Sequence, residues 1–287
     1  MTTEKASQTK TVNYGSTIYA VLISLVLCLL YWPTLRWMFN SRLASDYYSH
    51  SFLVPLVSIA VIWTKREQLK TREQSFSGIV WILAGATLYA LSMVLEIRVL
   101  GAISLIIEIT SLIWLFWGPR AVKALAFPLV FLLFMVPFPF IPDLAFRLQE
   151  ISVFSSSHLL ELSGLPITSA GAEIYLQTTV FTVGIPCSGI NSLVALLALA
   201  AVYAFILEGP LSKRIGLFVL AFPIAIIANI LRIVSIIMVA YYANVQTAAG
   251  WYHDISSPIF FILAFLAVIL AGRIMKCKIN YGLLRKQ

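Results

Sequence analysis

Long apolar segments alternate with short polar ones along almost the whole chain. About eight of the apolar segments approach the roughly 20 residues that an α-helix needs to cross the hydrocarbon core of a bilayer. We predict membrane-spanning helices at about residues 17–36, 47–64, 77–96, 99–118, 121–141, 188–207, 215–242 and 257–275. Prolines inside the fifth and seventh segments are expected to bend those helices without excluding them from the membrane. The pattern therefore predicts an all-α polytopic membrane protein.

The longest polar segment precedes the sixth predicted span and covers about residues 142–187. Its first half carries apolar residues at helical spacing, which indicates an amphipathic helix lying at the membrane interface. Its second half, from Glu173 to Val183, is rich in β-branched and aromatic residues. That composition favours a short hairpin or an extended strand immediately before the sixth span.

Composition supports the membrane assignment. Hydrophobic residues make up 60% of the 287-residue chain, and charged residues make up only 11%. A water-soluble domain does not carry that balance, so we interpret residues 1–287 as a single integral membrane domain. The first apolar segment follows a polar N-terminus, and we interpret it as a retained span and not as a signal peptide.

Lys and Arg are concentrated in alternate polar segments. If the N-terminus lies inside, the inner segments hold 15 of the 20 basic residues, the outer segments hold four, and Arg232 lies within a span. This distribution predicts that both termini are cytoplasmic in a cytoplasmic (inner) membrane, with tails at about 1–16 and 276–287 and an extracytoplasmic segment at about 142–187. The net charge of +8 is scattered and forms no patch with aromatic residues. It therefore argues against a nucleic-acid partner and favours contact with the lipid bilayer.

Three reactive side chains stand out against this apolar background. Cys187 lies just before the sixth span, Arg232 lies in the outer half of the seventh, and His253 lies in the loop before the eighth. The predicted topology brings all three to the outer side of the membrane. A thiol, a guanidinium and an imidazole together can perform acyl transfer through a thioester. We therefore predict that these three residues form a catalytic site.

Four neighbouring residues suit the same hypothesis. Ser188 and Gly189 fit a turn into the sixth helix, whose free N–H groups could hold a developing oxyanion. Asn229 precedes the arginine by three residues and so shares its helix face. Asp254 follows the histidine and is either its orienting partner or a solvated acid of the loop.

Arg232 also has a structural interpretation. Glu108, midway along the fourth span, could pair with it and so keep both charges out of the lipid. If such a pair lined a polar path, the protein would be a multi-pass transporter, although the sequence shows neither an inverted repeat nor a matching pair of broken spans. A non-catalytic assembly protein that binds apolar tails is a further alternative.

The sequence predicts no metal site and no cofactor. Its cysteines and histidines lack the spacing of metal ligands, and no Gly-rich phosphate loop is present. Cys28 lies within a span and Cys277 lies in the basic tail, so the three cysteines imply no disulfide framework.

Three motifs in order resemble the signatures of exosortases and archaeosortases, with exosortases the better match. They are Cys187–Ile190, Asn229–Ile233 and His253–Asp254. The segment Tyr48–Pro55 resembles the N-terminal element of the same family, and the resemblance covers roughly residues 45–275. It matches the cysteine, arginine and histidine of the family one for one with the three residues singled out above.

The resemblance implies a membrane-embedded cysteine protease or transpeptidase. Its substrates would be proteins with a C-terminal sorting signal, which consists of a short motif such as Pro-Glu-Pro, an apolar span and a basic tail. The enzyme would cut near the motif at the outer face and pass the protein to an unknown amine or hydroxyl acceptor. An intramembrane thiol protease that uses water in place of the acceptor is the nearest alternative.

Overall fold

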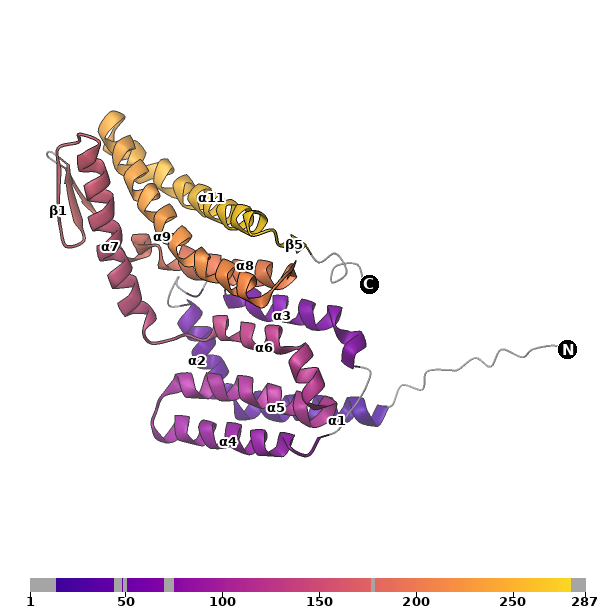
Figure 1. The fold of residues 1–287 in the computed structure, drawn as a ribbon. Helices are drawn as coiled ribbons and strands as arrows, with labels where there is room; N and C mark the ends of the chain where they lie inside the picture. Colours follow the sequence, from indigo (N-terminus) through magenta and orange to yellow (C-terminus); the bar gives the residue numbers. More distant parts are fainter. Residues whose placement is uncertain (1–13, 44–47, 49–50, 70–74, 177–178, 280–287) are drawn as a thin grey trace.

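The computed structural model describes residues 14–43, 48, 51–69, 75–176 and 179–279, and helices dominate it (Figure 1). The helices are α1 (Tyr14–Leu30), α2 (Trp32–Leu43), α3 (Leu53–Thr64), α4 (Gly78–Val94), α5 (Arg98–Ala124), α6 (Ala126–Phe131), α7 (Ile141–Leu162), α8 (Ile190–Ile206), α9 (Leu211–Tyr242), α10 (Val245–Thr247) and α11 (His253–Ile274). The strands are β1 (Ile167–Ala170), β2 (Glu173–Leu176), β3 (Thr179–Thr182), β4 (Leu207–Glu208) and β5 (Lys278–Ile279). Short 3-10 or π segments are η2 (Arg66–Leu69), η3 (Leu132–Met135), η4 (Ile185–Ser188) and η5 (Ala248–Tyr252).

Helices occupy the positions of the predicted spans. Within the described residues, three are long and apolar enough to cross a membrane: α5, α9 and the helical run Val245–Ile274 that contains α11. The bent pair α1–α2 would make a fourth, while α3, α4, α8 and the α6–η3 segment are shorter apolar helices. The predicted second span begins outside the described residues, and the part described as α3 has 12 residues. The fold is thus that of a polytopic helical membrane protein, whereas the count of eight spans remains a prediction.

The first predicted span, residues 17–36, is bent. α1 and α2 meet at Tyr31 with an angle of 65° between them. The Tyr31 side chain is fully buried at the bend, and its hydroxyl shares a 2.6 Å hydrogen bond with Ser104 of α5. Pro33 lies in the first turn of α2 and has no N–H with which to continue the helix from α1. The proline therefore explains why hydropathy alone predicted one element where the chain forms two.

The fifth predicted span, residues 121–141, is wrong as a continuous helix. α6 and η3 end at Met135, Val136 is extended, and α7 begins at Ile141. Pro137 explains the break, because a proline disfavours helical backbone in the residue before it and donates no N–H. The chain therefore passes from a short apolar helix directly into α7.

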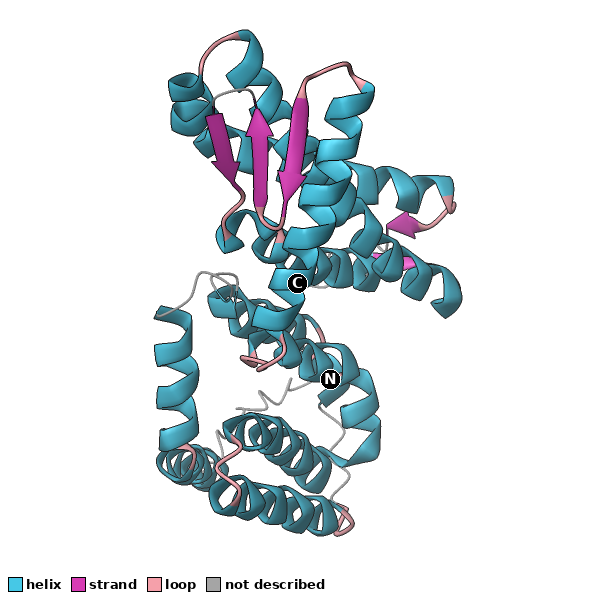
Figure 2. Cartoon of the chain, turned by 90° about the vertical axis from the view of Figure 1, so that its left-hand side faces the viewer, coloured by secondary structure: helices cyan, strands magenta, loops and turns pink. Residues whose placement is uncertain are grey.

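The segment before the sixth span folds, as predicted, into a helix followed by strands. α7 has a buried face that packs against α9, and the antiparallel strands β1, β2 and β3 follow it (Figure 2). β2 and β3 form the predicted hairpin, paired from Glu173↔Thr182 to Leu176↔Thr179. β1 adds a third strand that was not predicted. The interfacial position of α7 remains a prediction.

Small side chains bring α8, α9 and α11 close together. The buried residues at this contact include Ala200, Ala204, Leu217, Ala221, Ala225, Ala264 and Val268. Alanine at such positions lets helix backbones approach closely, which is a common way to pack helices in a membrane. Figure 1 shows α9 and α11 running side by side over much of their length. This packing holds the first half of α9 against the second half of α11, and the candidate residues lie further along α9 and at the start of α11.

Candidate active site

Cys187 lies on η4, a short helical turn between β3 and α8. Its side chain is partly exposed, and its N–H donates to the Gly184 carbonyl at 2.8 Å. This N–H is therefore not among the free donors that the sequence predicted at the start of the sixth helix. Gly189 adopts a left-handed conformation with φ 88°, and α8 begins at Ile190, whose N–H donates to Ser188 Oγ at 3.4 Å. The turn thus presents the sulfur beside the first turn of α8.

Asn229 holds this turn from α9. Its Nδ2 donates to the Cys187 carbonyl at 3.3 Å and to Ser152 Oγ of α7 at 3.1 Å. Asn229 is buried, and it lies so close to Gly189 that a Cβ added to the glycine would be 2.6 Å from Asn229 Cγ. The asparagine was predicted only to share a face with the arginine, and its contacts show that it fixes the backbone of the cysteine.

Arg232 follows one turn later on α9 and points toward the same place. It is buried, and its Nη2 lies 3.4 Å from His253 Nε2 and 4.0 Å from Cys187 Sγ. Its Nε is also buried and has no hydrogen-bond partner among the described residues. A buried N–H without a partner costs roughly 1–3 kcal/mol, so this donor is well suited to an acceptor on a bound molecule.

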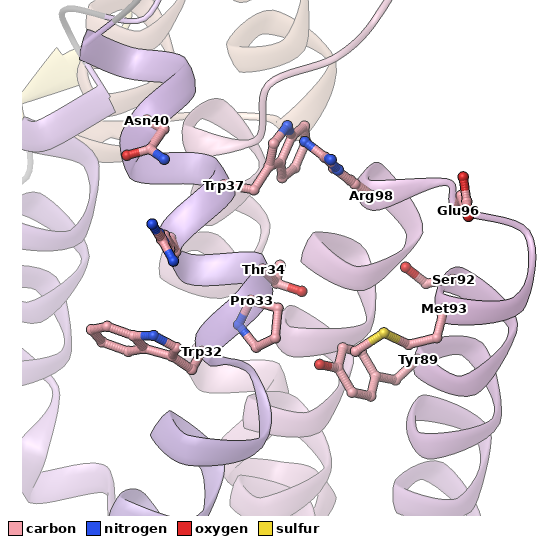
Figure 3. Close-up of a pocket in the computed structure, with 11 residues that line it drawn as sticks. Trp32, Pro33, Thr34, Trp37, Asn40, Tyr89, Ser92, Met93, Glu96 and Arg98 are labelled. Atoms are coloured by element: carbon pink, nitrogen blue, oxygen red, sulfur yellow. The ribbon is translucent and has the colours of Figure 1, made fainter.

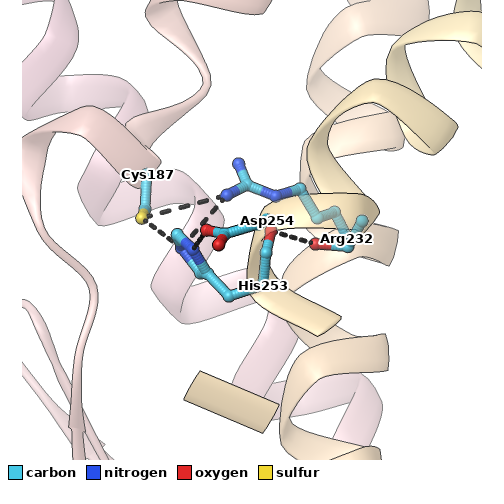
Figure 4. A network of polar contacts seen from close by, with 5 residues as sticks. Cys187, Arg232, His253 and Asp254 are labelled. Carbon is cyan, nitrogen blue, oxygen red and sulfur yellow. Dashed lines mark hydrogen bonds and ion pairs between the residues drawn. The ribbon is translucent and has the colours of Figure 1, made fainter. Parts of the chain in front are cut away.

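His253 completes the cluster as the first residue of α11 (Figure 4). Its Nε2 lies 3.3 Å from Cys187 Sγ, and its side chain is 38% exposed. The prediction of a loop at this position is wrong, because His253 already belongs to α11, although the helical run before it is kinked at Gly250. Asn244 starts that helical run by accepting a hydrogen bond from the Thr247 N–H at 2.7 Å. The imidazole is therefore held by a helix and not by a loop.

Asp254 lies beside the histidine but makes a weak contact. Its Oδ1 is 3.5 Å from His253 Nδ1, and its side chain is 84% exposed. An exposed ion pair contributes little free energy. The carboxylate can nevertheless favour the tautomer with the proton on Nδ1, which leaves Nε2 as the base that faces the sulfur.

The structure does not pair Glu108 with Arg232. Glu108 is buried in α5, where its carboxyl lies against Gly85 of α4. α5 packs against α2, α4 and α6, and the two charged residues form no ion pair in the described part of the chain. The predicted pair rested on Glu108 being an acid within a predicted span, which does not reveal which helices are neighbours.

A polar buried face of α7 supports the cluster, and the sequence analysis missed it. Gln149 Nε2 donates to the Val183 carbonyl, Ser152 accepts from Asn229, and Ser156 Oγ donates to the Ile230 carbonyl at 3.3 Å. The three α7 residues recur at intervals of three and four, which is the spacing of one helix face. That spacing was a usable signal, but the sequence analysis considered only the apolar residues of this segment.

A separate pocket lies away from this cluster, between α2, α4 and the start of α5 (Figure 3). It has a volume of about 620 Å³, and its lining includes Trp32, Trp37, Arg36, Arg98 and Glu96. None of the predicted site residues lines it. The sequence analysis used the two arginines only to orient the chain, because residues so far apart gave no sign of a shared pocket.

The cluster is arranged for nucleophilic chemistry at sulfur. With His253 Nε2 as the acceptor, the thiol proton can pass to the imidazole and leave a thiolate beside the Arg232 guanidinium. After the thiolate attacks a carbonyl carbon, the imidazolium can return the proton to the leaving group. Within the described residues, no three Cys, His, Asp or Glu side chains lie close enough together to hold a metal ion.

Gly189→Ala is expected to inactivate the site, because the new Cβ would push Asn229 off the Cys187 carbonyl. It should also lower the free energy of unfolding by about 1–3 kcal/mol, because residue 189 needs positive φ. Processing of a substrate and thermal unfolding in detergent measure the two effects. The matched control is Gly164→Ala, because Gly164 has φ 83° but open space around its Cβ position. Equal activity in the two variants would contradict the role of the Gly189–Asn229 contact.

Comparison with known proteins identifies the family of the chain. The family model described as transmembrane exosortase matches residues 37–270, which is most of the chain and includes Cys187, Arg232 and His253. No curated protein and no solved structure matches the chain. Since the match covers well over half of the sequence and the helices are those of a multi-pass membrane protein, the chain belongs to the transmembrane exosortase family.

Proposed function

We propose that this protein is a cysteine transpeptidase that cleaves C-terminal sorting signals at the outer face of the membrane. The observation that carries the proposal is the convergence of Cys187, Arg232 and His253, which come from three different elements, within 4.0 Å of one another. Family membership supports action on proteins that carry such a signal. The enzyme would recognise three parts of this signal at once: the short motif, the apolar span and the basic tail.

The outer location is supported by the course of α9. Lys213 and Arg214 lie in its first turn, as expected for a cytoplasmic end. Arg232 lies 21 residues after Leu211, or about 32 Å along the helix at ~1.5 Å per residue. Because the hydrocarbon core is about 30 Å thick, the cluster would lie close to its opposite boundary.

The reaction follows from the positions of the three groups. The substrate's apolar helix lies in the bilayer with its basic tail inside, so its motif reaches the sulfur. The Cys187 thiolate attacks the scissile carbonyl carbon, and Arg232 donates to the developing oxyanion. The carbon–nitrogen bond then breaks, His253 protonates the departing amine, and a thioester remains. An amine or hydroxyl acceptor displaces the sulfur and loses its proton to His253, which restores the enzyme.

The mass of the product tests this proposal against simple hydrolysis. Hydrolysis of a sorting-signal reporter would leave an N-terminal product with a free carboxylate. We expect transfer to give a heavier product, which exceeds that mass by the mass of the acceptor minus water. Added hydroxylamine should compete for the thioester and give a C-terminal hydroxamate, which intact-mass spectrometry detects. A product that is only the free carboxylate, in native membranes that contain the acceptor, would identify a thiol protease in place of a transpeptidase.

A further inference from the structure

β3 has one edge that no other strand of the described chain covers. The sheet order is β1-β2-β3, so β3 pairs with a strand on one side only. α7 packs against β1 and β2. Figure 2 shows β3 on the side of the sheet away from α7, with its end leading into the segment that carries Cys187. The open edge therefore belongs to the strand that precedes the nucleophile.

The pairing register decides which backbone groups face this edge. The Val183 N–H donates to the Ala172 carbonyl at 2.8 Å, so Val183 directs its backbone groups toward β2. Along a strand these groups alternate between the two sides, and Phe181 consequently also faces β2. Val180 and Thr182 therefore direct their N–H and C=O groups toward the open edge.

Nothing in the composition of β3 closes this edge. Folded proteins usually protect an edge strand with a charged residue, a proline or a bulge. The sequence Thr179-Val180-Phe181-Thr182 has no charge and no proline, and it pairs with β2 in unbroken register. Val180 is 49% exposed, and Thr182 is exposed as well. The edge can therefore accept a second extended chain.

We propose that the stretch of substrate before the scissile bond binds as a fourth strand along β3. This inference rests on the proposed function and names how its substrate is held. Only Val183–Pro186 separate β3 from Cys187, so a peptide that runs parallel to β3 brings its next residues to the sulfur. Addition of a strand supplies affinity from the peptide backbone and leaves alternate side chains free for selectivity.

The experiment is an N-methyl scan of a synthetic sorting-signal peptide, processed by the full-length wild-type enzyme in lipid vesicles. In parallel pairing, every second peptide residue directs both backbone groups toward β3. N-methylation at those residues should lower the processing rate by about fivefold each, the effect of one lost hydrogen bond. Methylation at the intervening residues should leave the rate near that of the unmodified peptide.

A matched pair of enzyme variants tests the same contact from the protein side. Thr182→Pro removes an N–H that faces the open edge, and we expect the processing rate to fall by about fivefold. Ser169→Pro is the control, because the same alternation directs the Ser169 N–H away from β2 at the opposite edge of the sheet. That variant should process the peptide at the wild-type rate.

The outcomes separate this inference from the function on which it rests. If the wild-type enzyme processes the peptide, but methylation has the same effect at every residue, β3 is not the binding strand. Equal rates for Thr182→Pro and Ser169→Pro would overturn the inference in the same way, and the transpeptidase proposal would stand. If the wild-type enzyme neither cleaves the unmodified peptide nor acylates Cys187, the proposed function itself fails.

Discussion

Replacing Cys187 with alanine is expected to abolish processing of a sorting-signal reporter, while the variant remains in the membrane at normal abundance. Without the sulfur no thioester can form, and neither Arg232 nor His253 can replace it as the attacking group. The stability of the protein should change little, because the thiol is partly exposed and its removal leaves no large cavity. The ratio of processed to unprocessed reporter in isolated membranes measures the effect.

The other two cysteines are the controls for this variant. Cys28 is exposed on α1, and Cys277 follows α11, where its Sγ contacts the Met275 carbonyl. Cys28→Ala and Cys277→Ala should both process the reporter at the wild-type rate. Normal processing by Cys187→Ala would rule out a covalent mechanism through this residue.

Arg232→Lys is expected to slow processing by roughly 100-fold or more, the usual effect of losing a donor to an oxyanion. The guanidinium reaches His253 and the sulfur through Nη2 and keeps Nε free for a further acceptor. An ammonium is a single point of charge and cannot present donors in this planar arrangement. Single-turnover rates of thioester formation would show whether the loss lies in the acylation step.

Arg214→Lys provides the matched control in the same helix. Arg214 donates through Nε to the Ala204 carbonyl at 2.6 Å and through Nη2 to the Phe205 carbonyl at 3.1 Å, at the opposite end of α9 from the cluster. We expect this variant to alter stability without altering the rate of acylation. If Arg232→Lys also acylates at the wild-type rate, the arginine has a structural role and the proposed mechanism is wrong.

The positions of the helices could be predicted because hydropathy reports on them directly. The apolar runs correspond to α3, α4, α5, α8, α9 and α11, and a composition rich in β-branched and aromatic residues indicated a hairpin or an extended strand where β2 and β3 pair. The three candidate residues could also be predicted, since a thiol, a guanidinium and an imidazole are conspicuous in so apolar a chain. The predicted topology placed them on one side of the membrane; that side stays a prediction, while the structure does bring the three side chains into contact.

Features that depend on neighbours in space could not be predicted. Two breaks have a local cause instead: the prolines of the fifth segment were expected to bend that span but interrupt it, and the bend at Tyr31 beside Pro33 was not predicted. The Glu108–Arg232 pair was plausible because both residues lie within predicted spans. However, α5 and α9 belong to different parts of the helix packing. The contact between Asn229 and Gly189 required the distance between α9 and the turn before α8, which no sequence pattern encodes.

The three candidate groups come from η4, α9 and α11, and α11 is the last helix among the described residues. A nascent chain that ends between Cys187 and His253 carries the thiol without the imidazole. In the proposed mechanism, such an unfinished chain cannot form a thioester, because the base that activates the thiol is not yet present. The order in which the three groups are synthesised would therefore delay activity until His253 is in place.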